Sequence, residues 1–304
     1  MRTAQTYSKV AFLICLFFSS PMAQANFVAC FSSNMGQFCI ELFDTQTPVT
    51  TANFLQYIDS GAYTNGIFHR SVPGFVIQGG GFKIVDGTSG KSLAAVNTFS
   101  PIVNEFKISN TRGTVAMAKL GSAPNSATSQ WFVNLADNSA NLDHQNGGFT
   151  VFGRVLFDGM TVFDAIAKLK IANLGGSLNA TPTINASGAV HSTDDLVQIN
   201  HVETVDVTGV FSDGILSFPV DIGTGQPYTV NLKLISSKPD FVFQLDPASV
   251  AALPVSPGNI ATFSSGNGQL HIPSVMIGPT AIVKNILMRL TDAGSYTFTL
   301  VSYE

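Results

Sequence analysis

Short apolar runs broken by polar and turn residues dominate this chain, and a helical spacing of apolar residues occurs in only two places. After Thr47-Pro48, apolar residues recur every three or four positions until Gly61, which predicts a helix over Pro48–Ser60. The same spacing predicts a second helix over Met160–Leu169. The other apolar runs are short and rich in β-branched and aromatic residues, so the pattern predicts a mainly β protein.

The pattern changes after Val207. From there to Glu304 no helical spacing occurs, and short strands alternate with Gly, Ser and Pro turns, which predicts a small all-β, sandwich-like domain over 207–304. Phe211–Pro219 resembles Phe263–Pro273, and further matches follow at a similar offset. This indicates two internal repeats, with chance similarity between turn-rich segments as the alternative. In the preceding part, 26–206, the stretch 83–111 has little periodicity and is predicted to be rich in loops.

Residues 1–25 have the pattern of a secretory signal peptide. Arg2 and Lys9 precede the apolar run Val10–Phe18, and Ala23-Gln24-Ala25 offers a cleavage site after Ala25. We therefore expect a periplasmic or secreted protein. The apolar run is too short to cross a bilayer as a helix, and no other stretch approaches that length, so no membrane span is predicted.

Composition narrows the possible partners. Of the 304 residues, 45% are hydrophobic and 11% charged, and the net charge is −4. A full hydrophobic core can form, and the slight acidity argues against nucleic acid or an anionic membrane as the main partner.

Two cysteines follow the predicted signal peptide. Residues 33–36 have the composition of a hairpin turn, and a hairpin centred on Asn34-Met35 places Cys30 opposite Cys39. We predict a cross-strand disulfide, which an oxidising compartment permits. Two buried free thiols on a core strand are the alternative.

Two stretches carry the candidate chemistry, 68–82 and 113–132. In the first, Arg70, Phe75, Val76 and Gln78 can direct a cation, two apolar side chains and an amide toward one shallow cavity. The histidines have no metal-ligand spacing, and neither a complete phosphate loop nor a G-x-S-x-G nucleophile elbow occurs. The predicted site therefore works without a metal, cofactor or nucleophile.

Five motifs occur in one order: FHRSVPGFVIQGGGF at 68–82, NTRGTVAMAK at 110–119, SATSQWFVNLADN at 126–138, LDH at 142–144 and VFGRV at 151–155. From Phe27 to Val205 the chain resembles the cyclophilin family of peptidyl-prolyl isomerases, in its bacterial type. The resemblance implies a closed eight-stranded antiparallel barrel with two capping helices. It also implies a pocket on the outside of the barrel that binds the proline of a polypeptide substrate.

The resemblance also implies roles for individual residues. It makes Arg70, Phe75 and Gln78 catalytic. The substrate-binding residues that it implies, or that surround these three, are Val76, Met117, Ala118, Lys119, Gln130, Phe132, Leu142 and Phe149. Taken singly, each apolar member could be ordinary core, and Arg70 could be a surface cation paired with Glu105.

The chain departs from the family pattern mainly in the pocket wall. Asn141 stands where many members carry an aromatic residue, which is tryptophan in those most sensitive to cyclosporin. Phe149 stands near a usual histidine or tyrosine, Val76 replaces a common methionine, and Gly81 replaces a common polar residue. We expect retained activity, an altered peptide preference and weak cyclosporin binding.

The leading hypothesis is a prolyl isomerase that assists folding of exported proteins. The competing hypothesis is a non-catalytic chaperone or cell-envelope binding protein that uses the cyclophilin groove and the β domain as binding surfaces.

Overall fold

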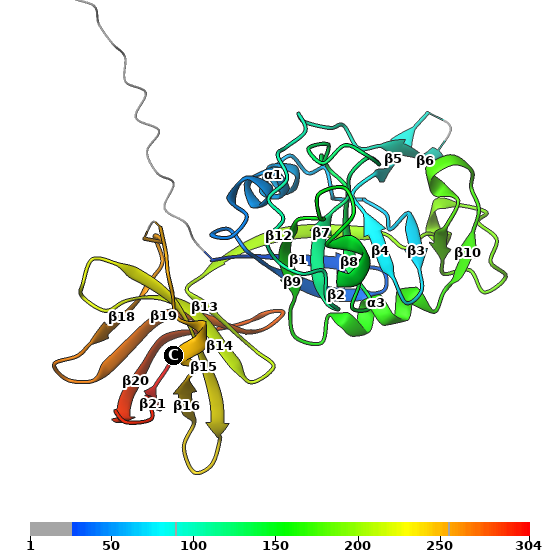
Figure 1. Ribbon diagram of the computed structural model, residues 1–304. Coiled ribbons are helices and arrows are strands. Elements are labelled where there is room, and N and C mark those ends of the chain that lie inside the picture. Colours follow the sequence, from blue (N-terminus) through cyan, green and yellow to red (C-terminus); the bar gives the residue numbers. More distant parts are fainter. Residues whose placement is uncertain (1–25, 89, 255) are drawn as a thin grey trace, which may run out of the picture.

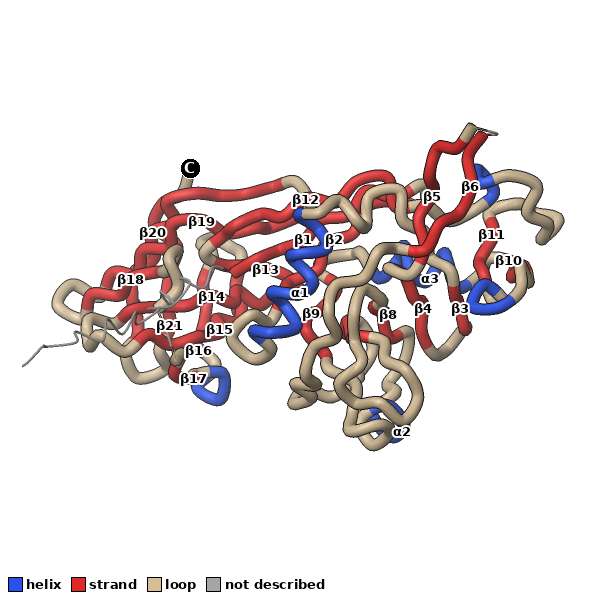
Figure 2. The backbone as a smooth tube through the Cα atoms, turned by 90° about the horizontal axis from the view of Figure 1, so that it is seen from above, coloured by secondary structure: helices blue, strands red, loops and turns tan. Residues whose placement is uncertain are grey.

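The computed structural model describes residues 26–88, 90–254 and 256–304. The predicted signal peptide, 1–25, lies outside these residues and stays a prediction. Two β-rich lobes follow one another along the chain, with strands β1 to β12 in the first and β13 to β21 in the second (Figure 1). Seen from above, the three labelled α-helices all lie in the N-terminal lobe (Figure 2). No helix in the described ranges is both long and apolar enough to cross a membrane.

Eight of the described strands form the main sheet of the N-terminal lobe, in the order β12-β1-β2-β9-β7-β8-β4-β3. They are β1 (Asn26–Ser33), β2 (Gly36–Leu42), β3 (Arg70–Val72), β4 (Val76–Gly79), β7 (Thr114–Met117), β8 (Trp131–Asn134), β9 (Val151–Val155) and β12 (Ile199–Val207). All neighbouring pairs are antiparallel.

The two edge strands of this sheet, β12 and β3, do not pair with each other as strands. The residues that precede them are joined instead by one antiparallel bridge, Ile67–Gln198, with hydrogen bonds from Phe68 N to Val197 O and from Ile199 N to Gly66 O. The mainly β architecture is therefore as expected. A barrel closed by continuous pairing of eight strands is not what the described residues show.

Large aromatic side chains fill the space that the sheet encloses. Five of these side chains are at most 1% exposed, and their rings contact one another in stacked, tilted or edge-to-face arrangements: Phe31, Phe38, Phe54, Phe68 and Trp131. This dense packing leaves the interior full, so a ligand site has to lie on the outer face of the sheet.

Both predicted helices are present, as α1 (Pro48–Asp59) and α3 (Met160–Ala167), and both bury one face against this core. Pro48 occupies the first turn of α1, where its missing N–H costs nothing. The Glu105 carboxylate accepts hydrogen bonds from the backbone N–H of Val49 and Thr50, at 3.3 and 2.8 Å. Glu105 therefore caps α1 and is not the partner of Arg70. A third, short helix, α2 (Ser139–Leu142), was not predicted.

Smaller elements surround this core. The hairpin of β5 (Phe82–Gly87) and β6 (Gly90–Ala95) lies within the stretch expected to be rich in loops. A second hairpin joins β10 (Lys170–Ala172) to β11 (Thr181–Thr183). Short 3₁₀ turns occupy Gly176–Leu178, Thr193–Asp195 and Pro247–Ser249.

The C-terminal lobe is a closed barrel, and the expected sandwich is wrong. Its strands are β13 (Gly209–Ser212), β14 (Ile215–Asp221), β15 (Pro227–Ser236), β16 (Val242–Leu245), β17 (Ala251–Ala252), β18 (Ala261–Ser264), β19 (Gln269–Gly278), β20 (Ala281–Asp292) and β21 (Thr297–Ser302). Strand β14 pairs with β15 on one side and with β18 on the other, so the ring β14-β18-β19-β20-β21-β16-β15 has no free edge. A sandwich leaves such edges open, whereas closure pairs every strand.

The two similar runs of the C-terminal lobe fold in the same order. Strands β13 to β16 are repeated by β18 to β21, and Phe243 of one run pairs with Phe298 of the other. Equivalent backbone hydrogen bonds recur at the same length: Leu234 N to Gly214 O and Leu290 N to Gly268 O, both 2.8 Å. The lobe therefore has an approximate twofold arrangement that matches its sequence similarity.

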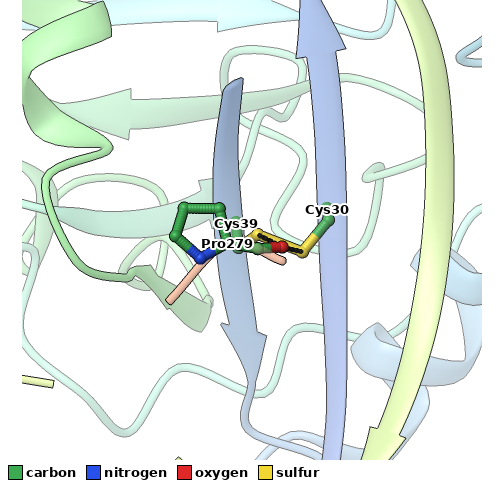
Figure 3. Close-up of a disulfide and its surroundings, with 3 residues drawn as sticks. All are labelled: Cys30, Cys39 and Pro279. Carbon is green, nitrogen blue, oxygen red and sulfur yellow. Dashed lines mark hydrogen bonds between the residues drawn. A yellow bond between two sulfur atoms is a disulfide. The ribbon is translucent and has the colours of Figure 1, made fainter. Parts of the chain in front are cut away.

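The predicted disulfide joins Cys30 to Cys39 across β1 and β2, in the expected register. The carbonyl oxygen of Pro279, in the turn between β19 and β20, lies 3.8 Å from each sulfur (Figure 3). Val210 and Met276 of the C-terminal barrel belong to the same apolar cluster as these cysteines. The disulfide thus lies where the two lobes meet.

We predict that replacing both cysteines by alanine, Cys30→Ala/Cys39→Ala, lowers the free energy of unfolding of the N-terminal lobe. A disulfide that closes a short loop contributes about 2–3 kcal/mol. The only tryptophan of the chain, Trp131, is buried in that lobe, so its fluorescence during urea denaturation reports this unfolding. Reducing the wild-type protein serves as the control and should give the same loss. An unchanged transition in both cases would contradict the prediction.

Candidate active site

A cavity of about 330 Å³ lies on the outer face of the N-terminal sheet. It is lined by Arg70, Phe75, Val76, Gln78, Ala118, Lys119, Phe132, Asn141, Leu142, Gln145 and Phe149. The sequence prediction had named nine of these eleven residues as candidate site residues. They come from β3, β4, β8, the segment after β7, and α2 with the loop that follows it.

Strand register explains how residues far apart in sequence meet here. Arg70 is opposite Gln78, Gln78 is opposite Phe132, and Phe132 is opposite Ala116. These residues form one row across β3, β4, β8 and β7, and side chains in one row lie on the same face. Their neighbours along the chain point inward, because successive side chains of a strand alternate between the two faces.

The same alternation corrects one predicted contact. Met117 was expected to contact the substrate, but it is 1% exposed and packs within the interior core. Its neighbour Ala116 belongs instead to the outer cluster with Val76, Phe132 and Leu142. The two-residue period of β7 places Met117 on the opposite face from the cavity.

Arg70 brings an uncompensated positive charge to the edge of this cavity. Its side chain is half-buried, and burial lowers the pKa of its guanidinium. Within the described ranges, no ion pair and no side-chain hydrogen bond involves this guanidinium. Because arginine keeps its charge at neutral pH, its five N–H donors are available to a bound molecule.

Gln78 is oriented by a second amide. Its Nε2 donates a hydrogen bond of 2.7 Å to Oε1 of Gln130, and its second N–H has no partner among the described residues. Gln130 does not line the cavity. Its carbonyl oxygen orients the amide of Gln78, and its direct contact with substrate stays a prediction.

Glycine allows the close approach behind this amide pair. A Cβ on Gly81 would lie 3.0 Å from the ring of His69 and 3.1 Å from the amide carbon of Gln130. Gly80 has a φ of +78°, and a Cβ there would collide with the Ser129 carbonyl. Gly80 is therefore required by the backbone, and Gly81 leaves room for the side chains of His69 and Gln130.

Lys119 lines the cavity, but its ammonium group is hydrogen-bonded to backbone carbonyls of the protein. Its Nζ donates to the carbonyl oxygens of Asn146 at 2.9 Å and Gly148 at 2.6 Å, and it lies 4.8 Å from the ring centre of Phe149. Burial lowers the pKa of Lys119. Lys119 therefore holds the loop that carries Phe149, whose ring packs edge to face on Phe132.

A buried network of amides supports the opposite wall. Asn110 donates through its backbone N–H and its Nδ2 to the Asp143 carboxylate, both at 2.9 Å, and Nδ2 also donates to the Phe149 carbonyl at 3.0 Å. Asn138 donates to the carbonyl of Phe75 at 2.9 Å. Burial tends to raise the pKa of Asp143, but the hydrogen bonds that its carboxylate accepts, chiefly from Asn110, outweigh burial and hold this pKa below its usual value. The network fixes the backbone at both ends of the apolar wall.

Asn141 and Gln145 line the cavity and were absent from the predicted contacts. The sequence had marked Asn141 only as a departure from the family pattern. Their spacing of four residues places them on one side of a helical turn, and the Gln145 amide donates a hydrogen bond to the Asn141 side chain. That spacing was the only indication in the sequence that they share a surface.

The lining determines what chemistry this cavity can perform. Apolar side chains form much of its lining, one edge carries Arg70 and an oriented amide, and the lining includes no acid, histidine, cysteine or hydroxyl side chain. Proton abstraction and nucleophilic attack require such groups or a neutral lysine amine, and the Nζ of Lys119 is hydrogen-bonded to two backbone carbonyls. The arrangement instead suits a ligand that is gripped through an apolar ring and hydrogen-bonded at a neighbouring polar atom.

Comparison with known proteins agrees with this geometry. Residues 27–189 match the protein family described as "Cyclophilin type peptidyl-prolyl cis-trans isomerase/CLD". The chain is 42% identical over 159 residues to "Peptidyl-prolyl cis-trans isomerase" of Acinetobacter baylyi, which covers 51% of this chain and 80% of that protein. It is 44% identical over 151 residues to "Peptidyl-prolyl cis-trans isomerase B" of Escherichia coli, covering 48% and 87%.

Among solved structures, the chain matches a cyclophilin type peptidyl-prolyl cis-trans isomerase of Cryptosporidium parvum, crystallised in the presence of the dipeptide Ala-Pro. It is 24% identical, with a TM-score of 0.42, and the match covers 58% of this chain and 96% of that one.

We predict that His69 makes stability depend on pH below neutrality. Burial lowers its pKa from 6.5 to about 4, partly opposed by its hydrogen bond with Gln130 and assisted by the charge of Arg70. Between pH 4 and pH 6.5 the unfolded chain therefore binds more protons at His69 than the native protein does. The free energy of unfolding should fall as the pH drops from 6.5 to 4. The loss reaches on the order of 3 kcal/mol.

The measurement compares wild type with His69→Gln by urea denaturation at several pH values. Asp44 has its pKa raised to about 7 by burial, so it acts with the opposite sign in the same range. Both proteins contain Asp44, so its contribution cancels when the free energy of unfolding of one is subtracted from that of the other. A difference that stays constant from pH 6.5 to pH 4 would show that His69 does not titrate as described.

Proposed function

The chain belongs to the cyclophilin-type peptidyl-prolyl cis-trans isomerase family, and we propose that the cavity beside Arg70 is where it catalyses rotation about X–Pro bonds. The observation that carries this proposal is a half-buried arginine at the edge of a largely apolar cavity, with no ion pair or side-chain hydrogen bond to any described residue. Such a cation is costly to hold in place unless a ligand uses its hydrogen-bond donors.

The reaction requires that conjugation in one amide be broken. Resonance between the proline nitrogen and the preceding carbonyl gives a barrier of about 18–20 kcal/mol. In the twisted state the nitrogen lone pair is released and becomes a hydrogen-bond acceptor, and Arg70 can donate to it. Because this acceptor is absent in the planar ground state, the interaction stabilises the transition state selectively.

The remaining residues hold the two sides of the rotating bond. Phe75, Val76, Phe132 and Leu142 form the apolar wall that receives the proline ring. The free N–H of Gln78 can bind a backbone carbonyl oxygen of the substrate. No proton transfer and no covalent intermediate is needed.

We further propose that the clients are exported polypeptides and that the protein is periplasmic or secreted. The predicted signal peptide and the Cys30–Cys39 disulfide support this compartment. Isomerase activity measured in periplasmic, secreted and cytoplasmic fractions tests it, and activity confined to the cytoplasm would contradict it.

We predict that Arg70→Ala lowers kcat/KM for a proline-containing test peptide about 10- to 100-fold. This is the effect of losing one hydrogen bond from a charged donor, worth about 1.5–3 kcal/mol. Arg289→Ala, at an exposed position on the C-terminal barrel, is the matched control and should leave the rate unchanged. Equal rates for Arg70→Ala and wild type would remove Arg70 from the mechanism.

We predict that wild-type protein binds cyclosporin weakly and that Asn141→Trp tightens binding at least about tenfold. Asn141 lines the cavity, and an indole there supplies a large apolar surface with one N–H donor. Inhibition of isomerase activity by cyclosporin measures the change, and Asn141→Ala is the control for loss of the amide alone. Tight inhibition of the wild type would contradict the prediction.

A further inference from the structure

Two apolar cavities lie in the C-terminal barrel, outside the part of the chain that the family accounts for. The larger has a volume of about 540 Å³ and the smaller about 290 Å³. The larger falls within the range of roughly 300–1,000 Å³ that is typical of small-molecule sites. Its inner wall is formed by Phe218, Val220, Leu232, Phe263, Leu270 and Phe298.

The two cavities occupy equivalent places in the two repeats. Phe263 pairs with Leu270 in the second repeat as Phe211 pairs with Leu216 in the first. The larger cavity is lined by Phe263 and Leu270 together with Leu232. The smaller cavity is lined by Phe211 and Leu216 together with Met288. Each cavity therefore combines a hairpin of one repeat with a strand of the other.

The larger cavity leads from the barrel interior to the surface. Phe218, Leu232 and Leu270 at its inner wall are at most 3% exposed, whereas Ile222 and Val250 at its mouth are 40% and 43% exposed. The described lining contains no charged residue. A molecule can therefore enter, and the deep part offers it only hydrocarbon and aromatic contacts.

The larger cavity has more polar groups than the smaller one, in which Tyr303 is the one polar side chain of the described lining. Tyr228 and Tyr296 stand at the positions that Val283 and Phe241 occupy in the smaller cavity, and Thr224 and Ser265 add two hydroxyls. Tyrosine combines an apolar ring with a hydroxyl that forms hydrogen bonds. The larger cavity thus has the features expected for a ligand that is apolar along its length and polar at one end.

The lining also distinguishes between classes of ligand. A polypeptide backbone carries an N–H and a carbonyl at nearly every residue, and the deep walls offer no partners for them. A phosphate or other charged group would lie unpaired there. An unbranched aliphatic chain has neither requirement, and each of its methylene groups gains from leaving water.

We propose that the larger cavity binds one unbranched aliphatic chain, of a fatty acid or a lipid, with the polar end of the ligand at the mouth near Ile222 and Val250. This site is separate from the isomerase cavity and does not depend on its assignment.

Calorimetric titration of the full-length mature protein with saturated fatty acids of increasing chain length, below their micelle concentrations, tests the proposal. Affinity should rise about fourfold for each added methylene group until the cavity is full, and then level off. The heat-capacity change should be negative, as for burial of apolar surface. Alcohols of the same chain lengths form a second arm, which separates recognition of a carboxylate from recognition of the chain. Affinity that does not increase with chain length overturns the proposal.

A matched pair of variants locates the site. Ile222→Trp narrows the mouth of the larger cavity, and Ile277→Trp makes the same change at the 46% exposed equivalent position of the smaller one. We expect the first to weaken binding at least about tenfold and the second to leave it unchanged. Circular dichroism and thermal unfolding check that both variants fold, and Val250→Trp replaces Ile222→Trp if that variant does not. Equal affinities for wild type and the mouth variant overturn the assignment. Binding of a leucine-rich peptide with no binding of fatty acids overturns it in favour of a protein-binding surface.

Discussion

The two-residue alternation of side chains across β3, β4 and β8 is the constraint on which both the core and the site depend. It sends Ile77, Trp131 and Val133 into the interior, and Val76, Gln78 and Phe132 to the outer face. Because Arg70, Gln78 and Phe132 share one cross-strand row, the position of the cation relative to the apolar wall is set by strand register. A shift of one residue in that register would bury the arginine and expose the tryptophan.

Much of this arrangement was predictable from the chain. The alternation within 68–82 indicates that Arg70, Val76 and Gln78 share a face, and the turn at Asn34-Met35 gives the disulfide register directly. Met117 was assigned to the substrate-binding residues from its motif alone, and it faces the interior instead. A motif identifies a segment that reaches the substrate, but only the phase of the strand decides which of its side chains does so.

Features that depend on distant backbone contacts were not predictable. The approach of Lys119 to the carbonyls of Asn146 and Gly148, and the link from Asn110 to Asp143 and Phe149, join segments whose separation the sequence does not encode locally. Closure of the C-terminal barrel depends on parallel pairing of β14 with β18, residues about forty positions apart. The sequence repeat indicated two similar units, but two such units can stack as a sandwich or close as a ring with the same strands.

The two lobes differ in what fills the interior of their closed or nearly closed sheets. In the N-terminal lobe, Trp131 and a set of phenylalanines fill the interior, so the proposed binding site lies on the outer face, where strand positions are free to carry an arginine and amides. In the C-terminal barrel, smaller side chains such as Val220, Val230 and Leu232 face the interior and leave space beside the phenylalanines. The deep lining of this interior is apolar, so it suits an apolar ligand. Side-chain size at inward positions therefore decides which lobe binds polypeptide on its outside and which has space for a hydrocarbon chain within.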